Sequence, residues 1–289
     1  MYFDNRLLET LVAYADNETV QGAADELMIS QPTVTRNLQK LEDDIGVKLF
    51  NRSANKIELN TTGRLAAQRA RELLDAQHQC IQEIQQYNFG QHHILLAATA
   101  PGPALFFTAH NPELPHIDND LLEHNEVGQA LMTYRYSAVF TTEEIFTDTI
   151  ESFYIGEEYL CAHVDAKLLP ADKGTVTFEE LNHLRFLVLT GLGQWQTVIE
   201  RNIPHAKFIS QNDRDDFLEI IDNSTLAHFS TNLSTGIVRN TSRRRLRITD
   251  AEAILPLYLT YLISEKQRLQ PVIDAYISAW PNDDALTMH

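Results

Sequence analysis

The sequence has few of the features that mark exported, membrane-spanning or disulfide-bonded proteins. Its two cysteines, Cys80 and Cys161, are too few for a disulfide framework. Its best apolar run, residues 94–98, falls far short of the ~18 residues that a membrane helix needs. Residues 1–4 have neither the basic nor the apolar character of a signal peptide. These absences predict a chain that works in the reducing cytoplasm and has no membrane partner.

Catalytic and metal-binding motifs are also missing. The histidines at 92, 93, 110, 116 and 124 have no spacing that pairs two ligands on one helix face, and no cysteine accompanies them. The chain has neither a G-x-S-x-G nucleophile motif nor a glycine-rich loop that would cradle phosphate. An enzyme that reused this chain would need acid, base or metal ligands gathered in a cleft. The sequence offers no such set, so we expect no catalytic residue, no metal and no cofactor.

Basic residues are scarce as well. There are 23 Lys and Arg residues against 40 Asp and Glu residues, which gives a net charge of −17. Nucleic-acid binding needs basic surface, so the charge of the whole chain argues against it. Residues 1–88 hold 9 basic and 13 acidic side chains, and residues 89–289 hold 14 and 27. Because the acidic excess lies mainly in the second part, the local arrangement of the first part decides the question.

What is present begins with three short helices. The 289 residues, 44% of them hydrophobic, are enough for two domains of ordinary size. Asp4, Thr19 and Ser30 are each placed to cap a helix. The third helix has Pro32 in its first turn, where the missing N–H would be unpaired anyway, and it ends before Gly46.

Two short runs follow the third helix. Residues 47–50 are apolar, residues 56–60 alternate between polar and apolar, and a turn-rich tip at 51–55 separates them. Such runs around a tight tip predict a β-hairpin. Short helices followed by a hairpin predict a winged helix-turn-helix over residues 1–60.

The third helix presents a polar and locally basic face. On a helical wheel its apolar side chains share one side, which leaves Arg36 and Gln39 pointing the opposite way. Arg and Gln can hydrogen-bond base edges through two atoms, and a helix N-terminus favours phosphate. The alternative is an ordinary exposed helix face. The residues expected to contact DNA from this helix and from the wing are Thr33, Thr35, Arg36, Gln39, Lys40, Lys48, Arg52 and Lys56.

One long helix is predicted over residues 61–88. Its positions 66, 70, 73, 77, 80, 84 and 87 are spaced three and four apart, which favours pairing with the same helix of a second copy. Leu65, Leu74 and Ile81 widen this stripe, so packing against the body of the chain stays open. Residues 88–91 are expected to end the helix.

A dense set of short motifs spans residues 19–64. It comprises Ala23-Ala24 with Leu27, the run Ser30-Gln31-Pro32-Thr33-Val34-Thr35-Arg36, Leu41-Glu42, Gly46-Val47-Lys48-Leu49-Phe50 with Arg52, and Thr61-Thr62-Gly63. These motifs resemble the DNA-binding domain of LysR-type transcriptional regulators. The resemblance implies a winged helix-turn-helix, a dimerising linker helix, and an effector domain of two α/β lobes built like a periplasmic binding protein. It also places Gln31, Pro32, Thr33, Thr35, Arg36, Gln39 and Arg52 where the family touches DNA.

Residues 89–289 alternate short apolar runs with helical patterns. The runs 94–99, 137–141, 186–189 and 258–263 predict buried strands, and 127–134, 195–201, 214–222 and 269–280 predict helices. This alternation favours an α/β domain with a largely parallel sheet. Following the resemblance, we assign residues 91–161 with 264–289 to a first lobe and 162–263 to a second.

Three loops of this domain are expected to meet between the lobes, where ligands of such folds bind. Their hydroxyls and backbone N–H groups would suit a small anion such as a carboxylate, although ordinary turn residues have the same composition. The residues concerned are Thr99, Ala100, Gly102, Thr190, Gly191, Ser230 and Thr231. The prolines at 101, 103, 112 and 115 are expected to interrupt the helix after the first strand, which puts the family's usual pocket in doubt.

A basic run at 243–247 stands out in this acidic domain. It would suit an acidic face of another subunit, DNA wrapped past the dimer, or a plain solvated strand or loop, and the sequence leaves all three open.

The sequence therefore predicts a cytoplasmic, sequence-specific transcriptional regulator of LysR type. It would bind double-stranded operator DNA as a dimer or tetramer under the control of a small-molecule effector. The alternative is a protein of the same build that answers to a protein partner or to no effector.

Overall fold

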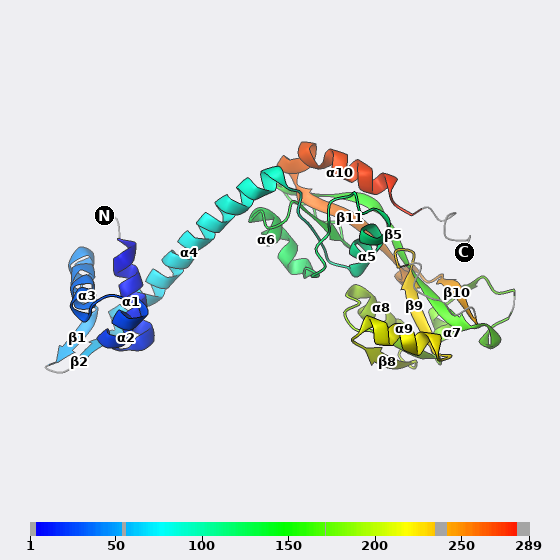
Figure 1. Cartoon of the computed structure of the whole chain (residues 1–289), viewed down its shortest axis with the longest axis horizontal. Coiled ribbons are helices and arrows are strands. Elements are labelled where there is room, and N and C mark those ends of the chain that lie inside the picture. The colour runs from blue at the N-terminus through cyan, green and yellow to red at the C-terminus, as the bar shows by residue number, and fades with distance from the viewer. Residues whose placement is uncertain (1–3, 54–55, 171, 235–241, 282–289) are drawn as a thin grey trace. The chain divides into compact units, whose positions relative to one another are not determined.

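The computed structural model describes residues 4–53, 56–170, 172–234 and 242–281. The chain divides into two compact units, Met1–Gln85 and Gln86–His289. Among the described residues, every helix is too short or too polar to cross a membrane. Figure 1 shows the elements of each unit.

The first unit is a small helical domain with a two-stranded wing. Its elements are α1 (Asn5–Asn17), α2 (Val20–Glu26), α3 (Gln31–Ile45), β1 (Phe50–Ser53), β2 (Lys56–Leu59) and the first part of α4 (Thr61–His92). The side chains of Asp4, Thr19 and Ser30 accept backbone N–H groups at the starts of α1, α2 and α3, which confirms the predicted caps. Gly46 ends α3 in the left-handed region with a φ of 81°.

The wing starts three residues later than predicted. β1 begins at Phe50, whereas the apolar run had suggested residue 47. The cause is Glu42 of α3, whose buried Oε1 accepts the backbone N–H groups of Leu49 at 2.7 Å and Phe50 at 3.2 Å. Because these two N–H groups bond to the carboxylate, they are not available for pairing with another strand. The strand therefore begins only at the end of the segment that Glu42 holds.

The helix α4 begins where the wing ends, and Gly63 fixes their contact. A Cβ added at Gly63 would overlap the carbonyl oxygen of Leu49 and lie 2.7 Å from Cδ2 of Leu59. The helix then continues to His92, beyond the predicted end at residue 88.

We expect Gly63→Ala to destabilise the first unit, because the methyl group would meet backbone that cannot move aside without shifting the wing. The cost of such overpacking is about 1–3 kcal/mol, and it should appear as a lower urea midpoint by circular dichroism. Gly90→Ala is the matched control on the same helix, since a Cβ there meets nothing within 4 Å. Helix propensity predicts that this control leaves stability unchanged or slightly raised. Equal midpoints for the two variants would show that the contact at Gly63 costs nothing.

The second unit is built on one mixed sheet. Its elements are the end of α4, β3 (Leu96–Ala98), α5 (Pro101–His110), α6 (Val127–Met132), β4 (Ala138–Thr141), β5 (Ile150–Asp165), β6 (Thr175–Val176), α7 (Phe178–Leu181), β7 (Arg185–Leu189), α8 (Gln194–Asn202), β8 (Lys207–Gln211), α9 (Arg214–Asp222), β9 (Ala227–Thr231), β10 (Arg243–Ile248), β11 (Ile254–Leu262) and α10 (Lys266–Ser278). The strand order is β3-β4-β11-β5-β9-β7-β8, with β10 paired to β5 and β6 paired to β10.

The 16-residue strand β5 joins two lobes. Its first half pairs with β11, and its second half pairs with β9 and β10 (Figure 1). In the first lobe, α5 and α10 pack on one face of the sheet and α6 on the other. In the second lobe, α7 and α8 cover one face and α9 the other.

The sheet differs from the prediction of a largely parallel one. The pairs β3–β4, β7–β8, β7–β9 and β6–β10 are parallel, whereas the long pairs that β5 makes with β11, β9 and β10 are antiparallel. The unit also places β11 between β4 and β5, in the sheet of the first lobe, whereas the predicted lobe boundary had assigned it to the second. No single apolar run reveals β5, because its first half mixes buried, half-buried and exposed residues without a regular alternation.

The prolines that were expected to interrupt the helix after β3 start it instead. Pro101 and Pro103 lie in the first turn of α5, where their missing N–H groups have no partner to lose. The helix runs to His110 and ends just before Pro112. The prediction was wrong because it counted prolines without placing them in the turn.

Candidate nucleic-acid interface and interlobe site

The start of α3 lines an open groove on the first unit, which we call the recognition groove. The groove has a volume of about 780 Å³ and is lined by Val20, Gln31, Pro32, Thr35, Arg36 and Gln39. Five of these six residues are on the helix that the sequence singled out. Arg36, Gln39 and Lys40 are exposed, while Thr33 and Thr35 are half-buried. The structure therefore brings five of the predicted DNA-contacting residues of α3 together in this groove, while Thr33 and Lys40 lie on the same helix outside its lining.

The helix is held by its inner face. Val34, Leu38 and Leu41 are buried in the core of the unit. Asn37 also turns inward, where its Nδ2 donates to Oγ1 of Thr10 at 3.0 Å. This leaves the outer face fixed in direction and free for a ligand. At the rim of the groove, Gln31 donates from Nε2 to Oε1 of Gln21, so its side chain is already oriented.

Burial of Glu42 removes an acid from the outer face. Glu42, Asp43 and Asp44 follow one another near the end of α3. Glu42 is 2% exposed and lies within 3.6 Å of the Lys48 ammonium. The carboxylate of Glu42 therefore faces the wing backbone and the Lys48 ammonium, and it adds no negative charge to the helix face that would meet DNA phosphates. Sequence reasoning missed this role, although Glu42 lies at the flank of the buried stripe.

The DNA contacts predicted for the wing concern Arg52, Lys56 and the neighbouring Lys48. Arg52 lies on β1 opposite Ile57, and Lys56 lies on β2 opposite Ser53. Their side chains lie outside the described residues, so their contacts with DNA stay a prediction. Lys48 extends from the segment before β1, and 72% of its side chain is exposed.

The turn between α2 and α3 contains a strained residue. Met28 has a φ of 53° and is 92% exposed. This left-handed conformation costs residues other than Gly, Asn and Asp about 1 kcal/mol, and a solvated methionine side chain makes no compensating contact.

We expect Met28→Asn to raise the unfolding free energy by about 1 kcal/mol, because asparagine tolerates this conformation. Met28→Val should lower it, since a β-branched side chain suits a positive φ least. Urea denaturation of the three proteins tests the order Asn, Met, Val. A Val variant as stable as the Asn variant would show that the turn relaxes without cost.

The second candidate site lies between the lobes of the second unit. Thr99 follows β3, and its carbonyl oxygen would lie 3.5 Å from a Cβ added at Gly193, in the loop after β7. Gly102 in the first turn of α5 lies against the carboxyl of Glu158, since an added Cβ there would lie 2.7 Å from Cδ and Oε2. The loops expected to meet therefore do approach each other.

Other predicted effector residues are engaged elsewhere. The Thr190 hydroxyl donates to Oδ1 of Asn212 at 3.0 Å, and Gly191 is exposed with a φ of 79°. Ser230 lies 2.8 Å from Nε2 of His163, on the opposite face of the sheet from its neighbour Thr231. Ala100 is buried and lends α5 no side-chain cap. Of the seven residues, Gly102 and Thr231 are the two placed beside Glu158.

Glu158 is the residue that sequence reasoning missed. It is 1% exposed, and burial raises the pKa of its carboxyl to about 7, although the nearby donor groups of Thr231 and Trp195 act to lower the pKa. A signal was available, because Glu158 is on the same face of β5 as the core residues Leu160 and Ala162. A carboxyl in that alternation must be buried.

The basic run has a structural role. Arg243 is 7% exposed and donates to the carbonyl oxygens of Ile221, Ser224 and Leu226. Arg245 donates to the carbonyl of Thr231 at 3.3 Å, and the Arg247 guanidinium lies 4.1 Å from the centre of the Tyr159 ring. The run therefore forms a strand, and these arginines contact neighbouring segments of the same chain rather than lying free in solvent.

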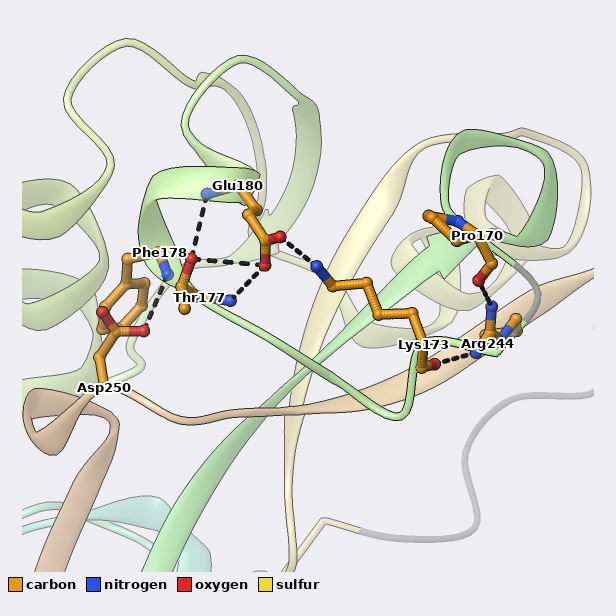
Figure 2. A network of polar contacts seen from close by, with 7 residues as sticks. All are labelled: Pro170, Lys173, Thr177, Phe178, Glu180, Arg244 and Asp250. Atoms are coloured by element: carbon orange, nitrogen blue, oxygen red, sulfur yellow. Dashed lines mark hydrogen bonds and ion pairs between the residues drawn. The ribbon is translucent and has the colours of Figure 1, made fainter.

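Arg244 joins the loop before β6 to this strand. Its guanidinium donates to the carbonyl oxygens of Pro170 and Lys173, and Lys173 pairs with Glu180, as Figure 2 shows. Glu180 in turn forms a capping box with Thr177 at the start of α7. The arginines of β10 therefore connect this strand to the neighbouring segments at the edge of the second lobe.

Comparison with known proteins agrees with this organisation. Residues 5–64 match the family model described as bacterial regulatory helix-turn-helix protein, lysR family. The chain is 29% identical over 144 residues to the HTH-type transcriptional regulator YxjO of Bacillus subtilis, and this match covers 44% of the chain and 50% of YxjO. It is 45% identical over 69 residues to the HTH-type transcriptional regulator TfdT of Cupriavidus pinatubonensis, covering 24% of the chain and 30% of TfdT. Each alignment thus spans half or less of the relative's own length.

The whole chain resembles a solved structure in fold. The crystal structure of Vibrio fischeri DarR in complex with DNA matches with a TM-score of 0.59, covering 96% of this chain and 98% of that chain at 20% identity. This likeness extends the match beyond the first unit to both lobes of the second.

Proposed function

Since residues 5–64 form a helix-turn-helix domain of the lysR family, we propose that the protein is a sequence-specific DNA-binding transcriptional regulator of LysR type. The observation that carries this proposal is the recognition groove at the exposed start of α3. The relatives found by sequence are described as transcriptional regulators, which favours a regulator over an enzyme. A regulator acts where the chromosome lies, so the proposal implies the cytoplasm.

The groove is suited to a DNA duplex. An α-helix fits the major groove, and the exposed Arg36 and Gln39 carry side chains that bond guanine and adenine edges through two atoms. The backbone N–H groups at the start of α3, next to Gln31 and Pro32, suit a phosphate. We assign Thr33, Thr35 and Lys40 to the flanks of this contact and Arg52 and Lys56 to the phosphates reached by the wing.

Pairing of two chains through α4 follows from the same proposal. Ala66 of α4 is half-buried against the core of the first unit and Ala70 is buried in it, so the start of this helix packs on its own chain. Farther along, Leu73, Cys80 and Ile84 are exposed, and Ile84 is 65% exposed. This divides the predicted stripe. Positions 66 and 70 serve the chain's own core, Gln77 and Tyr87 contact Asn5 and Tyr134 of the same chain, and Leu73, Cys80 and Ile84 are left for a second copy as dimer or tetramer.

The second unit supports control by a small molecule. Two lobes joined by β5 and β11, with loops that approach between them, are the usual geometry of a ligand-binding cleft. The prolines that had favoured a regulator without an effector do not disrupt the first lobe, because α5 is intact. We therefore favour effector control over control by a protein partner.

Fluorescence anisotropy with DNA from directly upstream of the gene tests the proposal. We expect tight binding that resists scrambled competitor DNA and weakens steeply with salt, since each phosphate contact releases counterions. The net charge of −17 disfavours binding to DNA, so tight binding would have to come from local contacts of the first unit. Binding that is weak and equal for operator and scrambled DNA would overturn sequence-specific recognition by this segment.

A further inference from the structure

The interlobe site contains a buried carboxyl that lacks a partner. We call Glu158 with Gly102, Trp195 and Thr231 the Glu158 cluster. Within the described part of the chain, Oε2 of Glu158 is a buried atom without a hydrogen-bond partner, and so is Nε1 of Trp195. Buried polar atoms are almost always hydrogen-bonded, so an unpaired acceptor beside an unpaired donor needs an explanation. A missing ligand provides one.

The cluster draws on both lobes. Gly102 belongs to α5 of the first lobe, whereas Trp195 of α8 and Thr231 of β9 belong to the second. Both α5 and α8 start without a side-chain cap, at Ala100 and at Gly193. Uncapped helix starts attract negative charge, and here the chain's own carboxyl lies beside the first turns of both.

Among the residues that the structure describes, no positive side chain balances this carboxyl. Its raised pKa comes from burial, and only the uncharged donors Thr231 and Trp195 act against burial. The partner of Glu158 on β11 is Leu255, and Gly102 carries no side chain at all. A buried carboxylate is normally paired with a cation or held by several hydrogen bonds, and the described residues around this one supply too few.

From these observations we propose that the interlobe site selects a ligand with a hydrogen-bond-donating cationic group, such as an amidinium or ammonium, and that Glu158 is its specificity-determining residue. The inference rests on the proposed effector control and reverses the sequence-based expectation of a carboxylate ligand. An incoming carboxylate would meet the ionised Glu158 next to the helix starts that should attract it. A cationic donor would instead satisfy Oε2.

Binding requires the loops of the two lobes to part. Gly193 has a φ of 57° and lies against Thr99 and Pro101, so this loop covers the cluster on one side. The glycine at 102 leaves room for the Glu158 carboxyl itself, because any Cβ there would overlap it. The ligand therefore reaches Glu158 by lobe opening, which links its binding to lobe geometry.

Thermal shift of the full chain with three probes of equal shape tests the proposal. Benzamidine, benzamide and benzoate differ in charge and in donors but share the ring, and an amidinium matches a carboxylate with two parallel N–H groups. The assay is run at pH 8.5, above the pKa of about 7 at which Glu158 ionises. We expect benzamidine to raise the melting temperature and benzoate to leave it unchanged. Glu158→Gln should weaken the benzamidine effect at least tenfold in apparent affinity, while Glu157→Gln, an exposed neighbour on β5, should retain it.

Three results would overturn the proposal: benzoate stabilising the parent as well as benzamidine does, a benzamidine shift that survives Glu158→Gln, or no shift with any probe. Operator binding is measured on the same samples. Specific DNA binding without a benzamidine effect rejects the ligand class and leaves the regulator standing. A benzamidine effect that depends on Glu158 in a chain that ignores its operator rejects the regulator and leaves the site standing.

Discussion

An Arg36→Ala variant should lose specific operator binding and keep the melting temperature of the parent. Arg36 is exposed in the recognition groove, and no core contact depends on its side chain. A two-atom contact from arginine to a base is worth about 1–3 kcal/mol of discrimination. A dimer binds through two copies of α3, so the free-energy loss is doubled and the affinity for the operator should fall roughly 30-fold or more. Anisotropy titration with operator and scrambled DNA measures it.

The control for charge is Arg69→Ala. Arg69 lies on α4 and pairs with Glu72 at 2.6 Å, and 67% of its side chain is exposed. Removing it takes the same charge from the same unit but from a different surface. We expect this variant to bind the operator nearly as tightly as the parent. Equal losses in the two variants would mean that Arg36 contributes only general charge, and an unchanged Arg36→Ala affinity would place base recognition elsewhere.

The first unit could be predicted from sequence because its signals are local. Caps such as Thr19 and Ser30 act within one turn, and the buried stripe of α3 repeats every three or four residues. The start of the wing could not be predicted, because it depends on Glu42 reaching the backbone of Leu49 seven residues away. A hydrogen bond from one side chain to the backbone of another segment produces no periodic pattern in the sequence.

The second unit was harder to predict because its sheet is assembled from distant segments. The helix at 214–222 was predicted to the residue, since its amphipathic pattern is self-contained. The strand β5 was missed, because its first half has an exposed face and its partners are strands nearly 100 residues away. Long-range pairing decides which face of such a strand is buried. For the same reason Glu158 was overlooked among the acidic residues of an acidic domain.

The burial of Glu158 also predicts how stability depends on pH. An acid whose pKa is raised on folding binds its proton more tightly in the folded state than in the unfolded state. Its contribution is therefore fully present below the unfolded value of 4.5 and is lost as the pH rises through about 7. The shift corresponds to about 3 kcal/mol.

Glu158→Gln imitates the protonated carboxyl and should remove this loss. We expect the variant to match the parent near pH 5 and to exceed it by about 3 kcal/mol at pH 8.5 in urea unfolding of the second unit. Other buried titratable groups, among them His163, whose pKa is lowered to about 4 mainly by burial, are common to both proteins, so their contributions cancel in the difference. Glu157→Gln, on the exposed side of the same strand, should show a flat difference across this range.

The direction of the difference separates the two roles that a buried glutamate could have. If Glu158 is held ionised by a donor in the folded chain, its replacement destabilises the protein most at high pH, where the carboxylate is formed. If Glu158 lacks its partner, as the unpaired Oε2 indicates, replacement stabilises the protein most at high pH. A variant that is weaker than the parent at pH 8.5 would therefore contradict both the pH dependence and the empty cationic position inferred for the interlobe site. A stronger one would mean that the protein gives up stability to keep a carboxylate ready for a ligand, as binding sites commonly do.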